Sequence, residues 1–511
     1  MHYYLGLDNG GTTTKASIYT SDGMELCTAS TDTKMIVPQP GFTERDMEEM
    51  WQANCQVIRD VIRMSGLDAA QIAALAVCGH GKGLYLWGKN DKPTRMGIIS
   101  TDKRSQMYVS RWKANRTEEN VFALSNQHIM ASQPVALLAW LKDHEPDCLK
   151  NIQYIFAAKD YIRFRLTGEA YAEYTDYSGD NFVNLSTKAY DKSLLGLFGL
   201  EELLPALPPL RKSTDICGYV TEEAAEKTGL KAGTPVAGGM FDIDACALAV
   251  GVTDESSICM IAGTWSINEY IRKTPVLDKT VLMNSLFCMP EYYLIEESSP
   301  TSAGNNQWFI HTLLPELQQQ AKTQGESIYE LMNTMVASLP ADSPCPIFHP
   351  FLMASNMHPN AMASFIGLSN YHTRAHLARS IYEGIAFAHR YHFEKLAATC
   401  PQLPEQIHLA GGAARSQVWA QIFADVMDMP VRTSNSKETG TLGCAITAAV
   451  ACGEYADIPT AVAHMVTLGA AILPKKENTD AYHKKYKYYL RFAQALSPLW
   501  DDYHNDILAQ T

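Results

Sequence analysis

The chain has 511 residues, which exceeds what one hydrophobic core usually organises and predicts two large domains. Apolar residues make up 46% of it and charged residues 19%, a composition typical of globular proteins and not of disordered ones. The net charge of −13 disfavours a general binder of nucleic acids or of anionic membranes. It does not exclude a nucleotide site, because backbone N–H groups and Mg²⁺ also bind phosphates inside acidic proteins.

Cysteine usage and the start of the chain both bear on its compartment. The twelve cysteines include no Cys-x-x-Cys pair, and Cys246, Cys259 and Cys444 lie inside apolar runs. This pattern is typical of reduced, buried thiols in a cytoplasmic protein. Residues 1–8 have no basic region and only a short apolar run, so they predict a first strand and not a signal peptide. No uninterrupted apolar stretch reaches membrane-spanning length, and we expect a cytoplasmic protein.

The first half of the chain opens with a predicted hairpin. An apolar run at 3–8, a Gly/Thr turn at 10–14 and a second run at 15–19 indicate strand, turn and returning strand. Residues 46–64 show helical periodicity, and 72–77 form the next buried strand. Strands and helices alternate to about residue 250, which predicts α/β layers.

A second region begins near residue 253 and repeats this design. Residues 257–262 form an apolar strand, Gly263 and Thr264 a turn, and 266–270 a returning strand. A strand at 406–410 runs into Gly411 and Gly412, and helices are expected at about 416–428 and 438–454. We therefore predict two similar α/β lobes, residues 1–252 and 253–511, with a short hinge at 251–256.

The turn after the first strand has the composition of a phosphate site. Its glycines let the backbone approach a ligand closely, and its threonine hydroxyls and N–H groups suit phosphate oxygens. Asp8, at the strand end, is placed to hold Mg²⁺ directly or through water. An ordinary hairpin turn has the same composition, but the second Gly-Thr turn at 263–264 favours two turns that grip one polyphosphate.

Asp242 is the candidate catalytic base. It follows Gly239 at the start of a helix of small residues, where a carboxylate is well placed to accept a proton from a substrate hydroxyl. An aspartate after glycines is also typical of a helix N-cap. Asp244 could equally be that cap.

Three further polar residues and one glycine pair are weaker signals. Gly411-Gly412, between a strand and a helix, is compatible with a purine platform, although many such turns contain glycine. His80, Asp102 and Gln133 lie near predicted element ends and suit a polyhydroxyl ligand. Each of these three is also typical of a surface or capping residue.

Other known phosphate-binding, metal-binding and kinase motifs are incomplete or absent in the sequence. The spacing from Gly83 to Lys89 fits a phosphate-binding loop, but Asn90 replaces the required Ser or Thr. His372 and His376 are four residues apart without the glutamate or third ligand of a metal site. No dinucleotide-binding Gly-x-Gly-x-x-Gly follows a strand, and no protein-kinase motif is present.

In this order, the pieces resemble the FGGY carbohydrate kinases of the sugar kinase, Hsp70 and actin superfamily. One family signature is matched throughout residues 363–383, and the resemblance covers nearly the whole chain. The other signature is matched imperfectly at 132–144, where Leu137 stands in place of the usual lysine.

The resemblance implies an α/β fold of two ribonuclease H-like lobes, of the actin, hexokinase and Hsp70 type, with a catalytic cleft between them. Residues 1–252 would bind the sugar and carry the base Asp242, and residues 253–511 would bind ATP. Asp8 matches the family's position for holding Mg²⁺. The residues implied to bind ATP are Gly11, Thr12, Thr13, Thr14, Lys15, Gly263, Thr264, Gly304, Gly411, Gly412, Ser416 and Asn435. The residues implied to bind the sugar are His80, Gly81, Asp102, Gln133 and Asp242.

Within the family, four stretches resemble bacterial L-xylulose kinases, namely residues 78–83, 133–135, 238–242 and 299–305. We therefore expect ATP-dependent phosphorylation of a ketopentose, L-xylulose first, at a primary hydroxyl. D-xylulose, 3-keto-L-gulonate, gluconate and other polyols remain alternatives, because a few pocket residues set the substrate within a fold.

Two functions of another class use the same superfamily fold, a nucleotide-gated binding protein and a sugar-sensing pseudokinase. Asp242 in its motif, both Gly-Thr turns and the lack of a further C-terminal partner domain favour the kinase. The expected partners are the sugar and MgATP, without nucleic acid or membrane. A homodimer is common in the family.

Overall fold

The computed structural model describes residues 2–355 and 357–508 of the chain, which form two compact units. The first unit comprises Met1–Thr253, Ile271–Ile295 and Glu438–Thr467, and the second comprises Asp254–Tyr270, Glu296–Lys437 and Leu468–Thr511. The first unit therefore contains more than the residues before the expected hinge, because two later segments of the chain pack with it.

The first unit contains strands and helices in alternation. Its strands are β1 (Tyr3–Asn9), β2 (Thr13–Thr20), β3 (Glu25–Asp32), β4 (Glu44–Arg45), β5 (Ile72–Gly79), β6 (Tyr85–Gly88), β7 (Gly97–Ile98), β8 (Ile152–Phe156), β9 (Ala172–Glu173), β10 (Val183–Asn184), β11 (Ala189–Tyr190), β12 (Leu210–Arg211), β13 (Ile216–Tyr219), β14 (Pro235–Ala237), β15 (Met240–Phe241) and β18 (Met283–Leu286). Its helices are α1 (Met47–Ser65), α2 (Gln106–Ala114), α3 (Thr117–Ser125), α4 (Pro134–His144), α5 (Asp147–Lys150), α6 (Ala158–Thr167), α7 (Tyr174–Gly179), α8 (Lys192–Leu197), α9 (Glu222–Thr228), α10 (Asp242–Ala249), α16 (Thr439–Ala451) and α17 (Ile458–Met465).

The second unit is also of α/β type. The strands that lie wholly or mainly in it are β16 (Ser257–Ala262), β17 (Ser266–Arg272), β19 (Tyr293–Ser299), β20 (Ile347–His349), β21 (Ser364–Ile366), β22 (Gln406–Gly411) and β23 (Val431–Thr433). Its helices are α11 (Gly304–Leu313), α12 (Pro315–Gln324), α13 (Ile328–Ala337), α14 (Arg374–Ala397), α15 (Gln417–Met427) and α18 (Lys476–Tyr503).

Each unit is built around a mixed sheet that begins with a hairpin. In the first, the strand order is β13-β14-β5-β1-β2-β3, and β1 runs antiparallel to β2 but parallel to β5. In the second, β19, β17, β16, β22 and β23 follow one another, with β16 antiparallel to β17 and parallel to β22. Both predicted glycine-turn hairpins are confirmed, because apolar runs on either side of a Gly/Thr turn pair most simply with each other.

The predicted first helix is confirmed as α1. Asp46 caps its N-terminus and accepts hydrogen bonds from the N–H groups of Glu48 and Glu49. Gly66 ends it at φ 67°, a left-handed conformation that glycine adopts without a Cβ penalty. The apolar face of the helix, including Trp51 and Ile58, is buried in the core of the first unit beside β2 and β3.

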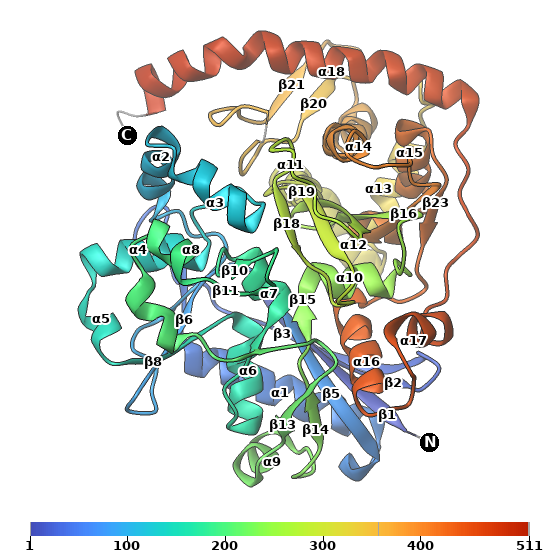
Figure 1. Cartoon of the computed structure of the whole chain (residues 1–511). Helices are drawn as coiled ribbons and strands as arrows, with labels where there is room; N and C mark the ends of the chain where they lie inside the picture. Colours follow the sequence, from blue (N-terminus) through green and yellow to red (C-terminus); the bar gives the residue numbers. More distant parts are fainter. Residues whose placement is uncertain (1, 356, 509–511) are drawn as a thin grey trace. The chain divides into compact units, whose positions relative to one another are not determined.

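Helix α16, close to the C-terminus in sequence, packs on β1 and β5 at the start of the chain (Figure 1). Its small residues make this possible. A Cβ on Gly443 would lie 2.3 Å from the carbonyl oxygen of Ala245 in α10. A Cβ on Gly6 of β1 would lie 1.8 Å from the carbonyl oxygen of Thr441. The sequence division at 252–253 did not anticipate that 438–467 return to the first unit.

The family signature at 363–383 has a structural role in the second unit. Arg379 of α14 donates to Glu383, to the hydroxyl of Tyr482 and to backbone carbonyls at the end of α13. Lys485 of α18 pairs with the other oxygen of Glu383 at 2.8 Å. These buried contacts fasten α14 to its neighbouring helices.

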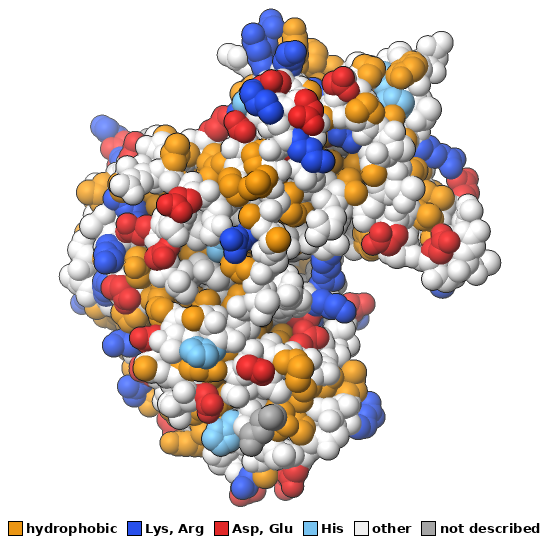
Figure 2. Space-filling model, turned by 90° about the vertical axis from the view of Figure 1, so that its right-hand side faces the viewer, with side chains coloured by type: hydrophobic (Ala, Val, Ile, Leu, Met, Phe, Trp, Pro, Cys, Tyr) orange, Lys and Arg blue, Asp and Glu red, His pale blue; other side chains and the backbone are white. Residues whose placement is uncertain are grey.

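The outer surface shows no dominant charge on the face seen in Figure 2. Basic and acidic side chains are interspersed there with apolar ones, and no continuous basic strip is visible on that face. Among the described residues, no helix combines the length and the apolar character that crossing a membrane requires.

We predict that Gly443→Ala lowers the free energy of unfolding by about 1–3 kcal/mol, because the added methyl group would overlap the backbone of α10. The matched control is Gly196→Ala in α8, where an added Cβ would have no neighbour closer than 4.0 Å. This control is expected to be neutral or slightly stabilising, since alanine is the better helix former. Urea unfolding of both variants measures the difference, and equal stabilities would contradict the close packing of α16.

Candidate active site

Three parallel strands of the first unit bring the candidate catalytic residues to one sheet edge. In the register of β1 and β5, Asp8 lies opposite Cys78, and in that of β15 and β5, Phe241 lies opposite Gly79. Asp8, His80 and Asp242 therefore stand at or just beyond the carboxyl ends of neighbouring strands. In open α/β sheets, this is the edge where ligands bind.

The turn after β1 is held in a fixed shape. The N–H of Gly10 donates to the carbonyl of Thr13 at 3.1 Å, and the buried guanidinium of Arg45 donates to the carbonyls of Gly10 and Gly11. Arg45 therefore fastens this turn at two of its carbonyls. Thr12 at its tip is exposed.

The remaining predicted phosphate contacts in this turn differ in their freedom. The hydroxyl of Thr13 donates to Asp32 at 3.3 Å, and that of Thr14 donates inward to Asn9 at 3.2 Å. Lys15 forms an ion pair with Glu438 at 2.6 Å. Among the residues of this turn that are expected to bind ATP, Thr13, Thr14 and Lys15 form side-chain contacts within the protein. Gly11 and Thr12 do not.

Asp8 lies against the first turn of α16. A Cβ on Gly440 would come within 2.6 Å of its Oδ2 atom, so only glycine leaves room for the carboxylate. Burial raises the pKa of Asp8 to about 6, and the negative charge of Glu438 adds to this while Lys15 opposes it. A bound cation would therefore stabilise the ionised form of the Asp8 carboxyl.

Asp242 is the first residue of α10, and its side chain is not the N-cap that the sequence left open. Phe241 occupies the cap position and makes no side-chain cap hydrogen bond. The backbone N–H of Ile243 donates to the Asp242 carboxylate, and no other hydrogen bond to it exists among the described residues. Burial raises the pKa of Asp242 well above its ordinary value, as do the neighbouring carboxylates of Asp8 and Asp176.

Asp244, the other candidate cap, is fully buried and faces a different part of the first unit. Its Oδ1 atom accepts the N–H of Cys288 at 3.0 Å, and its Oδ2 atom has no hydrogen-bond partner among the described residues. It therefore has a structural contact of its own and is no N-cap of α10.

His80 and Gly81 stand directly beside Asp242. Nε2 of His80 lies 2.7 Å from the Tyr85 hydroxyl, and burial lowers the pKa of His80 to about 3, so that the ring is neutral. A Cβ on Gly81 would lie 2.2 Å from the Phe241 ring. Glycine at this position lets the loop pack against the residue that precedes the base.

Asp102 and Gln133, also predicted to bind sugar, are saturated by protein groups. Asp102 accepts the backbone N–H of Thr43 and both side-chain and backbone donors of Arg104, two bonds on each oxygen. Both side chains are buried. Their hydrogen-bonding groups are used to hold loops in place. In this structure both residues therefore support the site and have no free group for a ligand.

The amide of Gln133 ties together the segments 127–130 and 179–181 of the first unit through four hydrogen bonds. It donates to Gln127 at 2.9 Å and to the carbonyl of Gly179 at 3.1 Å. It accepts from the N–H of Met130 at 3.0 Å and from the amide of Asn181 at 2.8 Å. No capacity remains for a sugar hydroxyl in this arrangement.

Sequence reasoning assigned no role to Lys82 and Asp180. The ammonium group of Lys82 lies 4.9 Å from the centre of the Phe241 ring and 3.6 Å from where a Cβ on Gly179, the residue before Asp180, would be. Burial raises the pKa of Asp180 well above its ordinary value, and the charge of Lys82 opposes this rise. Asp180 is only 2% exposed. One sequence signal was present for Lys82, a lysine between two glycines directly after a buried strand.

In the second unit, the predicted ATP residues converge at the carboxyl edge of β16 and β22. The carbonyls of Gly263 and Thr264 accept the N–H groups of Ala303 and Ser302, which brings the β16–β17 turn to the start of α11 at Gly304. A Cβ on Gly304 would lie 3.8 Å from the Thr264 carbonyl oxygen.

The glycine pair after β22 meets the same turn. Gly411 has φ 80°, and a Cβ there would lie 2.6 Å from the carbonyl oxygen of Ala262. A Cβ on Gly412 would lie 3.8 Å from the Cβ atom of Ala303. Five predicted residues, Gly263, Thr264, Gly304, Gly411 and Gly412, therefore surround one backbone-lined place.

Ser416 and Asn435 complete the predicted set. Ser416 is the N-cap of α15, where its hydroxyl accepts the N–H of Trp419 and donates to Asn333 at 2.6 Å. It is buried and committed to these contacts. Asn435 is exposed shortly after β23, the strand parallel to β22, and therefore lies at the same edge.

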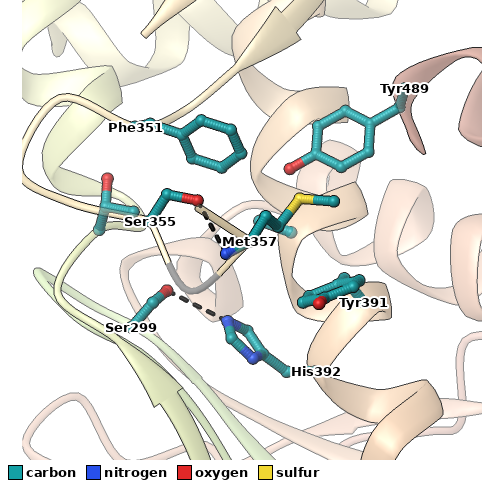
Figure 3. A pocket seen from close by; sticks show the side chains of 9 residues that line it. Ser299, Phe351, Ser355, Met357, Tyr391, His392 and Tyr489 are labelled. Carbon is teal, nitrogen blue, oxygen red and sulfur yellow. Dashed lines mark hydrogen bonds between the residues drawn. The ribbon is translucent and has the colours of Figure 1, made fainter. Parts of the chain in front are cut away.

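A separate small cavity in the second unit is not this place. It has a volume of about 10 Å³ and is lined by Ser299, Phe351, Met357, Tyr391, His392 and Tyr489, among others (Figure 3). His392 lies 3.2 Å from the Ser299 hydroxyl across its floor. A cavity of this size holds about one water molecule and no substrate.

Both halves of the chain match domains of a known protein family. Residues 3–249 match the N-terminal domain of the FGGY family of carbohydrate kinases, and residues 258–452 match its C-terminal domain. The chain belongs to this family.

The kinase is similar along nearly its whole length to several named relatives. It is 35% identical to the probable L-xylulose kinase of Haemophilus influenzae, over 98% of this chain and 100% of that protein. It is 36% identical to the L-xylulose/3-keto-L-gulonate kinase of Escherichia coli, over 97% of each. A crystal structure of xylulose kinase from Lactobacillus acidophilus superposes with a TM-score of 0.88 at 23% identity, over 98% of this chain and 100% of that one.

These matches confirm the expected fold and enzyme class. The kinase has the two-domain α/β fold of a xylulose kinase and a glycerol kinase of known structure. It is a sugar phosphotransferase, and ATP is the co-substrate of its family.

For the kinase, we predict that Gln133→Leu lowers the free energy of unfolding by at least about 2 kcal/mol, because it leaves the N–H of Met130 and the carbonyl of Gly179 buried without partners. The control Gln52→Leu, on the exposed face of α1, is expected to stay within about 0.5 kcal/mol. Chemical denaturation measures both. A stable Gln133→Leu enzyme with a raised KM for sugar would instead assign the amide to the substrate.

Proposed function

We propose that this enzyme phosphorylates L-xylulose at a primary hydroxyl, with Asp242 as the general base and Mg²⁺ held near Asp8. The first unit would bind the sugar and the second unit the nucleotide. The observation that carries the proposal is the state of Asp242, a carboxylate that caps no helix and has a raised pKa beside Asp8 and His80.

A raised pKa suits the role of base in phosphoryl transfer. The substrate hydroxyl becomes acidic only as its oxygen bonds to phosphorus, and a carboxylate with a higher pKa accepts the proton more readily. Asp242 must be ionised to act, so turnover falls as the pH drops through its folded-state pKa. Because that pKa lies above the ordinary value of aspartate, the loss begins at a higher pH than for an exposed aspartate.

Asp8 fits a magnesium ion that arrives with ATP. Mg²⁺ is usually held by one or two carboxylates together with substrate phosphates and water. Asp8 is one such carboxylate, and its pKa of about 6 reflects burial and the nearby charge of Glu438, which a cation would offset. When bound, the ion would neutralise charge on the phosphates, while the N–H groups of Gly11 and Thr12 would be left for phosphate oxygens.

The second unit supports nucleotide binding through its glycines. Gly263, Gly304, Gly411 and Gly412 leave backbone without side chains around one place at the edge of β16 and β22. Such a surface admits a flat base and phosphates close to the main chain. Asn435, exposed at the same edge, is available to the base.

The choice of L-xylulose rests on the relatives. The proteins from Haemophilus influenzae and Escherichia coli both carry this sugar in their names, and the second also carries 3-keto-L-gulonate. We therefore propose the ketopentose as substrate and keep the keto acid as the second candidate. The twelve cysteines all have free thiols, which suits work in the reducing cytoplasm.

We predict that L-xylulose gives the highest kcat/KM in a coupled assay of ADP release with ketoses, polyols and sugar acids, and that ATP hydrolysis without sugar stays far lower. The panel includes D-xylulose, 3-keto-L-gulonate and gluconate. A clear preference for another member would replace the substrate and keep the enzyme class. ATP turnover that no sugar stimulates would contradict the proposed function.

We predict that Asp242→Asn lowers kcat by about 10²–10⁴-fold and leaves the KM for sugar within a few-fold, because asparagine keeps the shape but cannot accept the proton. The matched control is Asp244→Asn, two residues along α10, where an amide oxygen can still accept the N–H of Cys288. Steady-state kinetics of both variants decide the assignment. Near-normal turnover of Asp242→Asn would show that another group is the base.

A further inference from the structure

The backbone at Lys82 is held in a conformation that lysine adopts only at a cost. Lys82 has φ 61°, and such a left-handed conformation costs a side chain other than glycine about 1–3 kcal/mol. Both neighbours are glycines that the packing requires, since a Cβ on Gly81 would meet the Phe241 ring and one on Gly83 would lie 2.5 Å from the carbonyl oxygen of Ile98. A third glycine would fit this loop more easily, so the lysine side chain itself has a use.

The loop directs this side chain to the edge where Asp242 stands. The ammonium nitrogen of Lys82 lies 4.9 Å from the centre of the Phe241 ring, the residue before Asp242. It lies 3.3 Å from the sulfur of Met283, a weak acceptor, and 3.6 Å from where a Cβ on Gly179 would be. No carboxylate of a described residue comes within ion-pair distance, so the ammonium keeps unused hydrogen-bond donors.

Unused acceptors lie next to these unused donors. Asp180 directly follows Gly179, is 2% exposed, and its carboxyl forms no hydrogen bond or ion pair with any described residue. Asn181, also in a left-handed conformation at φ 61°, donates to Gln133 but leaves its buried Oδ1 atom without a partner. Buried polar groups without partners are rare in native proteins and indicate a ligand or water.

The other charges nearby form ion pairs with one another. Lys159 pairs with Asp176 at 2.8 Å and with Asp160 at 3.0 Å, and Arg163 pairs with Asp160 at 2.7 Å. Lys82 and Asp180 are left over from this network. Lys82 supplies a donor next to Phe241, the residue before the candidate base, and Asp180 supplies an acceptor next to Lys82. Together they match the donor and acceptor groups of a hydroxylated ligand.

We propose that Lys82 and Asp180 bind the sugar, with Lys82 donating to a hydroxyl or keto oxygen and Asp180 accepting from a hydroxyl. The inference rests on the proposed function and deepens it by naming two residues that contact the substrate.

The test uses Lys82→Met, which keeps the packing on Phe241 and removes the donors. The KM for L-xylulose is expected to rise by about 10–100-fold with kcat within about three-fold, since a hydrogen bond to a charged group is lost. Asp180→Asn, which keeps the shape of the side chain, is expected to raise the KM in the same direction. Lys89→Met at an exposed position should leave both constants unchanged.

Monodeoxy ketopentoses identify the contact itself. One deoxy analogue should have the same raised KM with the wild type and with Lys82→Met, because it lacks the oxygen that Lys82 would bind. If Lys82→Met abolishes turnover of 3-keto-L-gulonate and spares that of L-xylulose, Lys82 is a carboxylate receptor and the proposed contact with a hydroxyl or keto oxygen is wrong.

The outcomes separate this inference from the proposed function. If the wild-type enzyme turns over no ketose, the proposed function is wrong, and so is the proposal that Lys82 and Asp180 contact this sugar. A wild-type enzyme active on L-xylulose, with unchanged KM in folded Lys82→Met and Asp180→Asn variants, overturns the inference alone. Thermal unfolding of each variant confirms that a raised KM does not arise from loss of structure.

Discussion

The parallel pairing of β1, β5 and β15 is the constraint on which the site depends. It fixes Asp8, His80 and Asp242 at the carboxyl ends of adjacent strands, although the three residues are spread over more than 230 positions of the sequence. None of them is placed by its immediate neighbours alone. A shift of one residue in either register would turn the side chains to the opposite face and disperse the group.

This edge also depends on a late segment of the chain. Helix α16 packs on β1 and β5 through glycines, and its Gly440 leaves the space in which the Asp8 carboxylate lies. Glu438, just before the helix, holds Lys15 and contributes to the raised pKa of Asp8. The environment of a residue at the start of the chain is thus set by residues more than 400 positions away.

The parts predictable from the sequence are those with local causes. Each glycine-turn hairpin, the helix α1 with its Asp46 cap, and the strand leading to Gly411 depend on residues within a short window. The helix of small residues that begins at Asp242 was also predicted and is α10. The sequence also pointed to the glycines that converge in the second unit, because no other residue permits such close approach of backbone.

The parts that the sequence did not reveal depend on distant partners. Asp102 and Gln133 have the polarity of sugar ligands, but Thr43 and Gly179 occupy their hydrogen-bonding groups. Lys82 and Asp180 show the reverse. Only the three-dimensional structure reveals that no carboxylate of a described residue pairs with Lys82 and that the Asp180 carboxyl has no hydrogen-bond partner among those residues. Long-range hydrogen bonding therefore decides which polar residues near the edge remain available to a substrate.

The most direct test of this account is a crystal structure of the enzyme with L-xylulose bound. The account predicts the sugar at the carboxyl edge of β1, β5 and β15, with a primary hydroxyl oxygen at hydrogen-bonding distance, about 2.6–3.2 Å, from the Asp242 carboxylate. A sugar bound elsewhere, or one whose primary hydroxyls all lie beyond the reach of Asp242, would contradict it.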